Sequence, residues 1–82
     1  MKIIDVREPS EYAESHVEGA VNIPLGDLIK RIDEVPKDEE VVVYCRSGGR
    51  AGVALQGLTS MGYTNVINGI NQAEVEAKHG SI

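Results

Sequence analysis

A continuous run of β-branched and aromatic residues, Val41-Val42-Val43-Tyr44, constrains the fold of this chain more than any other stretch. Strands with one face in water alternate apolar and polar residues, whereas an uninterrupted run is typical of a strand that is covered on both faces. Strands of that kind occur mainly in parallel sheets, because the connecting helices pack over the sheet. Residues 41–44 therefore predict a buried strand of a parallel sheet.

The segments on either side of this run alternate between strand and helix patterns. We predict further strands at residues 2–6, 20–23 and 65–67, and helices at residues 9–14, 25–34, 51–61 and 70–78. Such an alternation is typical of an α/β domain in which right-handed crossovers connect parallel strands. The predicted fold is a single small α/β domain over residues 1–82, with helices on both faces of a parallel sheet.

Two of the predicted helices have clear apolar faces. The helix at residues 25–34 follows the i, i+3, i+4, i+7 spacing, with an apolar face made of Leu25, Leu28, Ile29 and Ile32. The helix at residues 51–61 would end at Gly62 and bury Ala51, Ala54, Leu55, Leu58 and Met61. Further along, Asn68-Gly69 predicts a turn between the last strand and the final helix.

Length and charge limit the class of protein. The chain has 82 residues, enough for one domain with a modest core, and we expect a monomer. A net charge of −5 without a basic tract argues against nucleic-acid or membrane partners. No apolar run reaches the about 18 residues of a membrane-spanning helix. No signal peptide is evident, which favours the cytoplasm, but the start at Met1-Lys2 also fits a periplasmic protein whose leader has been removed.

Cys45 is the one cysteine of the chain, and it directly follows the predicted buried strand. A lone cysteine excludes an internal disulfide, a C-x-x-C redox pair and a thiolate zinc cluster. Ligands of parallel α/β sheets bind beyond the carboxyl ends of the strands, which is where Cys45 lies. After it, Ser47, Gly48 and Gly49 let the backbone curl so that its N–H groups can face an anion, and the helix from Ala51 adds its N-terminal dipole.

Arg46 and Arg50 add positive charge on both sides of this loop. Basic neighbours and helix N-termini lower the pKa of a thiol from its usual value of about 8.5, and so favour the nucleophilic thiolate. The same groups would hold an anionic substrate beside Cys45. The alternative is an inert, buried thiol followed by an ordinary glycine turn, and the two flanking arginines favour the reactive site over it.

The sequence resembles the rhodanese family over nearly its whole length. Its segments Asp5–Glu8, Glu11–Tyr12 and His16–Leu25 match the N-terminal signature of the family, Val43–Ala51 is similar to its active-site strand and loop, and Met61–Val66 to the segment after the active-site helix. The resemblance is strongest to the short phage shock protein E-type rhodaneses. Relative to many members, this sequence lacks a first strand and helix. Its segment from 67 to 71 is one residue short of the common Gly-Gly form and is not followed by the usual Trp.

The resemblance implies a sulfurtransferase that works without a cofactor or metal. Thiosulfate or a similar small anionic donor would transfer its sulfane sulfur to Cys45, the nucleophile, and the persulfide would pass it to cyanide or a thiol, with a thioredoxin-like protein as one candidate acceptor. The cradle around the sulfur would be formed by Arg46, Ser47, Gly48, Gly49 and Arg50. Of these, Arg46 and Arg50 are the candidates for binding the donor anion.

Three other functions compete with this one. The related Cys-based phosphatases and arsenate reductases have one more residue between Cys and Arg, so the C-x₄-R spacing from Cys45 to Arg50 favours sulfur over a tetrahedral oxyanion. A non-catalytic sulfur-carrier or interaction module is a second alternative, against which the intact Cys45 argues. A redox sensor or peroxidase is the third, and it would need an external resolving thiol.

Several polar residues outside the loop are interpreted as structural. We expect His16 to lie in a turn, and we expect Asp5 and Arg7 to form an ion pair or hydrogen-bonded turn at the end of the first strand, where Arg7 adds at most a small electrostatic contribution to the site. The acidic residues Glu8, Glu11 and Glu14 are expected to form one polar helix face and not a metal site.

Overall fold

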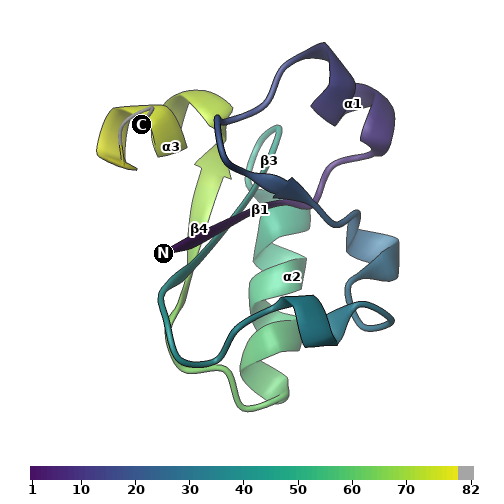
Figure 1. Cartoon of the computed structure of the whole chain (residues 1–82), viewed down its shortest axis with the longest axis vertical. Coiled ribbons are helices and arrows are strands. Elements are labelled where there is room, and N and C mark those ends of the chain that lie inside the picture. The colour runs from purple at the N-terminus through teal and green to yellow at the C-terminus, as the bar shows by residue number, and fades with distance from the viewer. Residues whose placement is uncertain (80–82) are drawn as a thin grey trace.

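The computed structural model describes residues 1–79 of the chain. In chain order its elements are β1 (Lys2–Asp5), α1 (Pro9–Glu14), β2 (Val21–Asn22), the 3₁₀ turns η1 (Leu25–Asp27) and η2 (Ile32–Glu34), β3 (Val41–Cys45), α2 (Gly49–Ser60), β4 (Val66–Asn71) and α3 (Gln72–His79). The strands pair in parallel in the order β2-β1-β3-β4 (Figure 1). The predicted parallel α/β fold is confirmed. No helix within residues 1–79 is long and apolar enough to cross a membrane.

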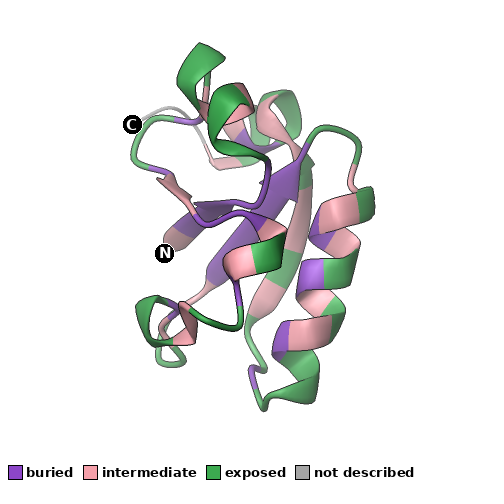
Figure 2. Cartoon of the chain, turned by 90° about the vertical axis from the view of Figure 1, so that its right-hand side faces the viewer, coloured by how far each residue is buried: buried purple, intermediate pink, exposed green. Residues whose placement is uncertain are grey.

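β3 is the most buried element of the sheet, as its uninterrupted apolar run predicts. It pairs with β1 on one side and β4 on the other, and all five of its residues are buried. Because successive side chains of a strand point to opposite faces, β3 contributes to two separate apolar clusters. Val41, Val43 and Cys45 belong to one cluster, and Val42 and Tyr44 to the other. Figure 2 shows the buried strands between the outer elements.

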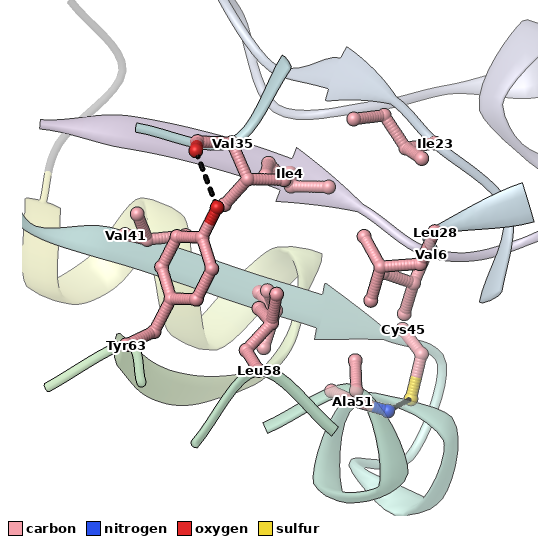
Figure 3. Packing of buried hydrophobic residues seen from close by; sticks show 12 residues of the cluster. Ile4, Val6, Ile23, Leu28, Val35, Val41, Cys45, Ala51, Leu58 and Tyr63 are labelled. Carbon is pink, nitrogen blue, oxygen red and sulfur yellow. Dashed lines mark hydrogen bonds between the residues drawn. The ribbon is translucent and has the colours of Figure 1, made fainter. Parts of the chain in front are cut away.

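The first cluster lies between the sheet and α2 (Figure 3). α2 buries Ala51, Ala54 and Leu58, whose small or compact side chains let the helix pack closely on β3. The predicted burial of Met61 is wrong, because its side chain is 41% exposed. The helix ends as predicted at Gly62, where the N–H groups of Gly62 and Tyr63 donate to the carbonyls of Thr59 and Leu58 in a Schellman arrangement.

The second cluster covers the opposite face of the sheet and includes Val75 of α3, with Tyr12 of α1 packed against it. Helices thus flank both faces of the sheet. Tyr44 is fully buried here, and its phenolic oxygen accepts a 3.0 Å hydrogen bond from the N–H of Val17. Both α1 and α3 lie near the end of the sheet toward which β4 points (Figure 1), and this is the end at which the loop after β3 begins.

The predicted helix at residues 25–34 is wrong. The segment forms η1 and η2 joined by a turn, held largely by i→i−3 hydrogen bonds such as Leu28 N–H to the Leu25 carbonyl. A 3₁₀ turn aligns residues three apart, so Leu25 and Leu28 share the inner side while Ile29 turns outward and is 57% exposed. The short segment follows the edge of the core under β2, and packing there outweighs the helical pattern.

The predicted turn at Asn68-Gly69 is also wrong, because β4 runs through it to Asn71 and α3 starts only at Gln72. The pairing with β3 shifts by one residue between Val43 and Tyr44, which leaves Gly69 as the extra residue of a bulge. A Cβ atom at Gly69 would lie 2.6 Å from the side chain of Val75 and 2.8 Å from that of Val42. Glycine is therefore required here for close packing and not for a turn. The next residue, Ile70, has φ of +76°.

Candidate active site

Cys45 lies at the carboxyl end of β3 and is 2% exposed. Its Sγ accepts hydrogen bonds from the backbone N–H groups of Gly48, at 3.1 Å, and Ala51, at 3.4 Å. Figure 3 shows the second of these bonds, with the Ala51 nitrogen directed at the sulfur from the start of α2. The sulfur therefore lies where the sequence predicts it, at the N-terminus of a helix and inside a curled loop.

The curl of the loop depends on Gly48, the residue immediately before α2. Its φ of +94° is accessible to glycine at little cost, and it turns the Gly48 N–H back toward Sγ. Its carbonyl points the other way and accepts the first helical hydrogen bond from Gly52 N–H at 2.8 Å. Gly49 is the first residue of α2 and does not have a positive φ. Of the two glycines, only Gly48 uses the left-handed region.

Two opposing effects act on the ionisation of Cys45. Burial by itself raises the pKa of the thiol, because it disfavours the charged form. The backbone N–H groups of Ala51, Ser47, Gly48 and Arg50 stabilise the thiolate and outweigh burial, so that the pKa of Cys45 lies below the usual value for a thiol. The thiolate is therefore favoured mainly by oriented backbone dipoles.

Arg46 and Arg50 are both bound by Glu11, a residue of the predicted polar face of α1. The Glu11 carboxylate accepts a hydrogen bond from Arg46 Nε at 2.9 Å and from Arg50 Nη1 and Nη2 at 2.8 and 3.1 Å. The Glu11 side chain is only 17% exposed, against 63% for Arg46 and 36% for Arg50. The polar face of α1 therefore supplies a carboxylate that pairs with both arginines of the loop, a role of Glu11 that the sequence did not predict. The position of Glu11 in the N-terminal signature was the one signal in the sequence that could have singled it out.

Asn68 of β4 is a second residue that the sequence analysis missed. Its Nδ2 donates to the carbonyl oxygen of Gly48 at 3.1 Å, and its Oδ1 accepts from the N–H of Ile70 at 2.8 Å. One side chain thus joins the loop that carries the sulfur to the bulge in β4. The Asn68-Gly69 pair predicts a turn, and no local pattern in the sequence indicates this bond.

The polar residues expected to be structural do form local contacts. Arg7 donates to both carboxylate oxygens of buried Asp5, with the shortest bond at 2.7 Å, and also to the Ser15 carbonyl. His16 stacks on Tyr12 with ring centroids 3.6 Å apart, and its Nδ1 lies 2.8 Å from the Tyr12 carbonyl oxygen. The predicted Asp5–Arg7 ion pair is confirmed. Among residues 1–79 no three His, Cys, Asp or Glu side chains gather closely enough to hold a metal ion.

A shallow hollow lies at the opposite end of the molecule from Cys45. It is lined by Ile32, Asp33, Val35, Lys37, Met61 and Tyr63. Figure 3 shows Tyr63 and Cys45 at opposite ends of the first cluster, with the Tyr63 hydroxyl bonded to the Val35 carbonyl. This hollow therefore takes no part in the chemistry of the loop.

Comparison with known proteins relates the chain to sulfur-transferring enzymes. It is 49% identical over 67 residues to the thiosulfate sulfurtransferase PspE of Escherichia coli, a match that covers 79% of this chain and 64% of PspE. It is 40% identical over 68 residues to the "Putative sulfur carrier protein YrkF" of Bacillus subtilis, covering 83% of this chain and 37% of that protein. The chain thus spans about two-fifths to two-thirds of the length of these relatives.

Solved structures and a family model agree with these matches. A rhodanese from E. coli, solved with anions, superposes with a TM-score of 0.83 at 43% identity, covering 89% of this chain and 88% of that one. The model of the rhodanese-like domain matches residues 1–71, a range that includes β3, the loop and α2. The names of both relatives, PspE and YrkF, refer to the transfer or the carriage of sulfur. The chain belongs to the rhodanese-like domain family.

Proposed function

We propose that this protein transfers sulfane sulfur from thiosulfate, or a similar anionic donor, to an acceptor by way of a persulfide on Cys45. The observation that carries the proposal is the position of Sγ at the N-terminus of α2, within hydrogen-bond distance of the Gly48 and Ala51 N–H groups. These dipoles favour the thiolate that must attack the donor. They would also stabilise the negative charge of the persulfide that results.

The first half-reaction forms one S–S bond and breaks another. The Cys45 thiolate attacks the outer sulfur of thiosulfate, the S–S bond of the donor breaks, and sulfite leaves with its electron pair. The products are the Cys45 persulfide anion and sulfite, so charge and atoms balance without an oxidant or a proton. Arg46 and Arg50, which flank the loop, supply the positive charge that attracts the donor anion.

The second half-reaction returns Cys45 to the thiolate. Cyanide, or the thiolate of an acceptor such as a thioredoxin-like protein, attacks the outer sulfur of the persulfide, and Cys45 is the leaving group. The products are thiocyanate, or a persulfide on the acceptor, and the free enzyme. With Cys45 as its one cysteine, the chain has no second thiol to receive the sulfur, so the relay must end on another molecule.

The direct test combines turnover with intact mass. Wild-type protein and Cys45→Ser are incubated with thiosulfate alone for mass analysis, and with thiosulfate and cyanide for thiocyanate formation. We expect the wild type to gain the mass of one sulfur atom, which a thiol reductant removes, and to release thiocyanate. Cys45→Ser, shown to be folded by circular dichroism, should do neither. A folded wild type with no sulfur adduct and no turnover would reject the proposal.

A sulfur-carrier function is the alternative that the comparison with YrkF favours. A carrier would also accept sulfur on Cys45, but would pass it to a specific protein thiol and not to cyanide. Isolated Cys45 persulfide mixed with cyanide separates the two functions. Release of thiocyanate within seconds supports the enzyme, whereas a persulfide that persists in cyanide supports the carrier.

A further inference from the structure

Glu11 binds both arginines of the loop, and hydrogen bonds hold each of its two carboxylate oxygens in place. Its Oε1 accepts from Arg50 Nη1 and, at 3.0 Å, from the Glu8 N–H at the start of α1. Its Oε2 accepts from Arg46 Nε and Arg50 Nη2. The carboxylate therefore accepts four hydrogen bonds, one of them from the backbone of its own helix. An incoming anion cannot displace it without breaking these bonds.

Each terminal nitrogen of Arg50 donates one of its two N–H groups to Glu11. While Glu11 is in place, Arg50 cannot offer the pair of N–H groups between its two terminal nitrogens to a donor anion, and part of its charge interaction is directed at a carboxylate. The carboxylate stays charged, because hydrogen bonds from Arg50, the Glu8 N–H and Arg46 hold the pKa of Glu11 well below its usual range. Two arginines and one fixed carboxylate present a single net positive charge beside the Cys45 thiolate.

We propose that Glu11 is a specificity-determining residue that weakens the binding of doubly charged sulfur donors relative to singly charged ones. This inference rests on the proposed sulfur transfer and defines its donor class. A fixed negative charge repels a dianion about twice as strongly as a monoanion at the same place. With Glu11 in place, the loop therefore favours monoanionic donors, such as thiosulfonates and organic persulfides, over dianions more than a loop with the two arginines alone would.

Thiosulfate and methanethiosulfonate form a matched pair of donors for testing this. Both give up one sulfane sulfur to the Cys45 thiolate by the same attack. The first is a dianion and releases sulfite, and the second is a monoanion and releases methanesulfinate. In each case one S–S bond forms and one breaks, and the total charge is unchanged. A difference between them in response to a variant therefore reports on charge at the binding site.

The first arm compares the wild type with Glu11→Gln and Glu11→Asp in steady-state assays with both donors. Glu11→Gln removes the charge at nearly constant shape, and should raise kcat/KM for thiosulfate through a lower KM, by about three- to tenfold more than for methanethiosulfonate. Glu11→Asp keeps the charge and changes the geometry, so its ratio of the two values should stay near that of the wild type.

A role limited to orienting the arginines predicts the opposite. In that case Glu11→Gln would raise KM for both donors alike, and Glu11→Asp would do the same. A rise in KM for both donors alike in Glu11→Gln, in protein shown to be folded by circular dichroism, would overturn the inference. An unchanged donor ratio in Glu11→Gln would overturn it too.

The second arm measures anion binding without turnover, so that the inference and the proposed function can fail separately. Thiosulfate is titrated into Cys45→Ser and into Cys45→Ser/Glu11→Gln by calorimetry. Tighter binding by the double variant, by about three- to tenfold, supports the role of Glu11 even if the wild type shows no turnover. Equal or weaker binding overturns the role of Glu11, even if the Cys45 persulfide forms as proposed.

Discussion

The side-chain amide of Asn68 donates a hydrogen bond to the carbonyl oxygen of Gly48, the residue whose N–H points at the Cys45 sulfur. The two residues are 20 positions apart in the chain: Gly48 immediately precedes α2, and Asn68 lies in β4. The bond ties the loop to β4 and thereby restrains the orientation of the Gly48 backbone. Asn68 is thus a positioning residue, since it acts on the sulfur through Gly48.

Replacing Asn68 should therefore alter the reactivity of Cys45 without touching the sulfur. In Asn68→Ala and in the isosteric Asn68→Asp the donor to Gly48 is lost, the loop loosens, and the pKa of Cys45 should rise. A net contribution of about 0.5–1.5 kcal/mol for one hydrogen bond corresponds to a two- to tenfold slower alkylation by iodoacetamide at neutral pH. Alkylation rates measured across pH would check this. Slower alkylation with an unshifted pH profile would contradict it.

The close packing at Gly69 predicts a large loss of stability on adding one methyl group. In Gly69→Ala the new Cβ would meet the side chains of Val75 and Val42 at 2.6 and 2.8 Å, so either α3 or β4 must move. We expect the free energy of unfolding in urea to fall by about 1–3 kcal/mol. Gly57→Ala is the matched control, because that position lies inside α2 with nothing within 4 Å. It should gain about 0.5–1 kcal/mol from the higher helix propensity of Ala. Equal effects at the two positions would refute the packing argument.

The lowered pKa of Cys45 predicts a pH-dependent difference in stability between the wild type and Cys45→Ser. A group with a depressed pKa in the folded state adds stability that is fully present above its unfolded pKa and is lost as the pH falls through its folded pKa. The wild type should therefore gain stability relative to Cys45→Ser as the pH rises from neutral toward about 9. Urea unfolding of both proteins under reducing conditions measures the difference. A difference that is flat or falls over this range would show that the thiolate is not favoured by folding.

The pKa of Tyr44 is raised in the folded state, whereas that of Cys45 is lowered, so Tyr44 should make the protein less stable at high pH. Burial raises the pKa of Tyr44 to about 12, so the folded state keeps the phenol proton after the unfolded state has lost it. The contribution of Tyr44 is present below pH about 10 and is lost as the pH rises toward 12. The comparison with Tyr44→Phe isolates it, since that variant lacks the phenol.

At neutral pH the same variant tests the hydrogen bond that Tyr44 accepts from Val17. In Tyr44→Phe the N–H of fully buried Val17 has no acceptor at this position, which should cost about 1–3 kcal/mol. The urea midpoint is the measurement. A variant as stable as the wild type would mean that Val17 finds another partner.

The sequence alone determined the parts of this protein that depend on local patterns. The β-branched run from Val41 to Tyr44 specifies a strand buried on both faces, because a sheet covered on both sides is the place where an uninterrupted apolar run is fully buried. The segment from Cys45 to Arg50 then specifies a tight loop into a helix, although the sequence does not say which of its two glycines adopts the positive φ. The motifs along the chain were enough to indicate the rhodanese family and to single out Cys45 as the candidate nucleophile.

Only the tertiary structure decided which distant side chains meet at the loop. Glu11 lies 35 and 39 residues before Arg46 and Arg50, and Asn68 lies 20 residues after Gly48. Neither contact has a local signature, because a glutamate on a short helix and an asparagine before a glycine are ordinary surface and turn residues in most proteins. The parallel strand order brings α1 and β4 to the end of β3. The ion pairs and hydrogen bonds at the loop therefore join residues that are far apart in the sequence and become neighbours only in the folded chain.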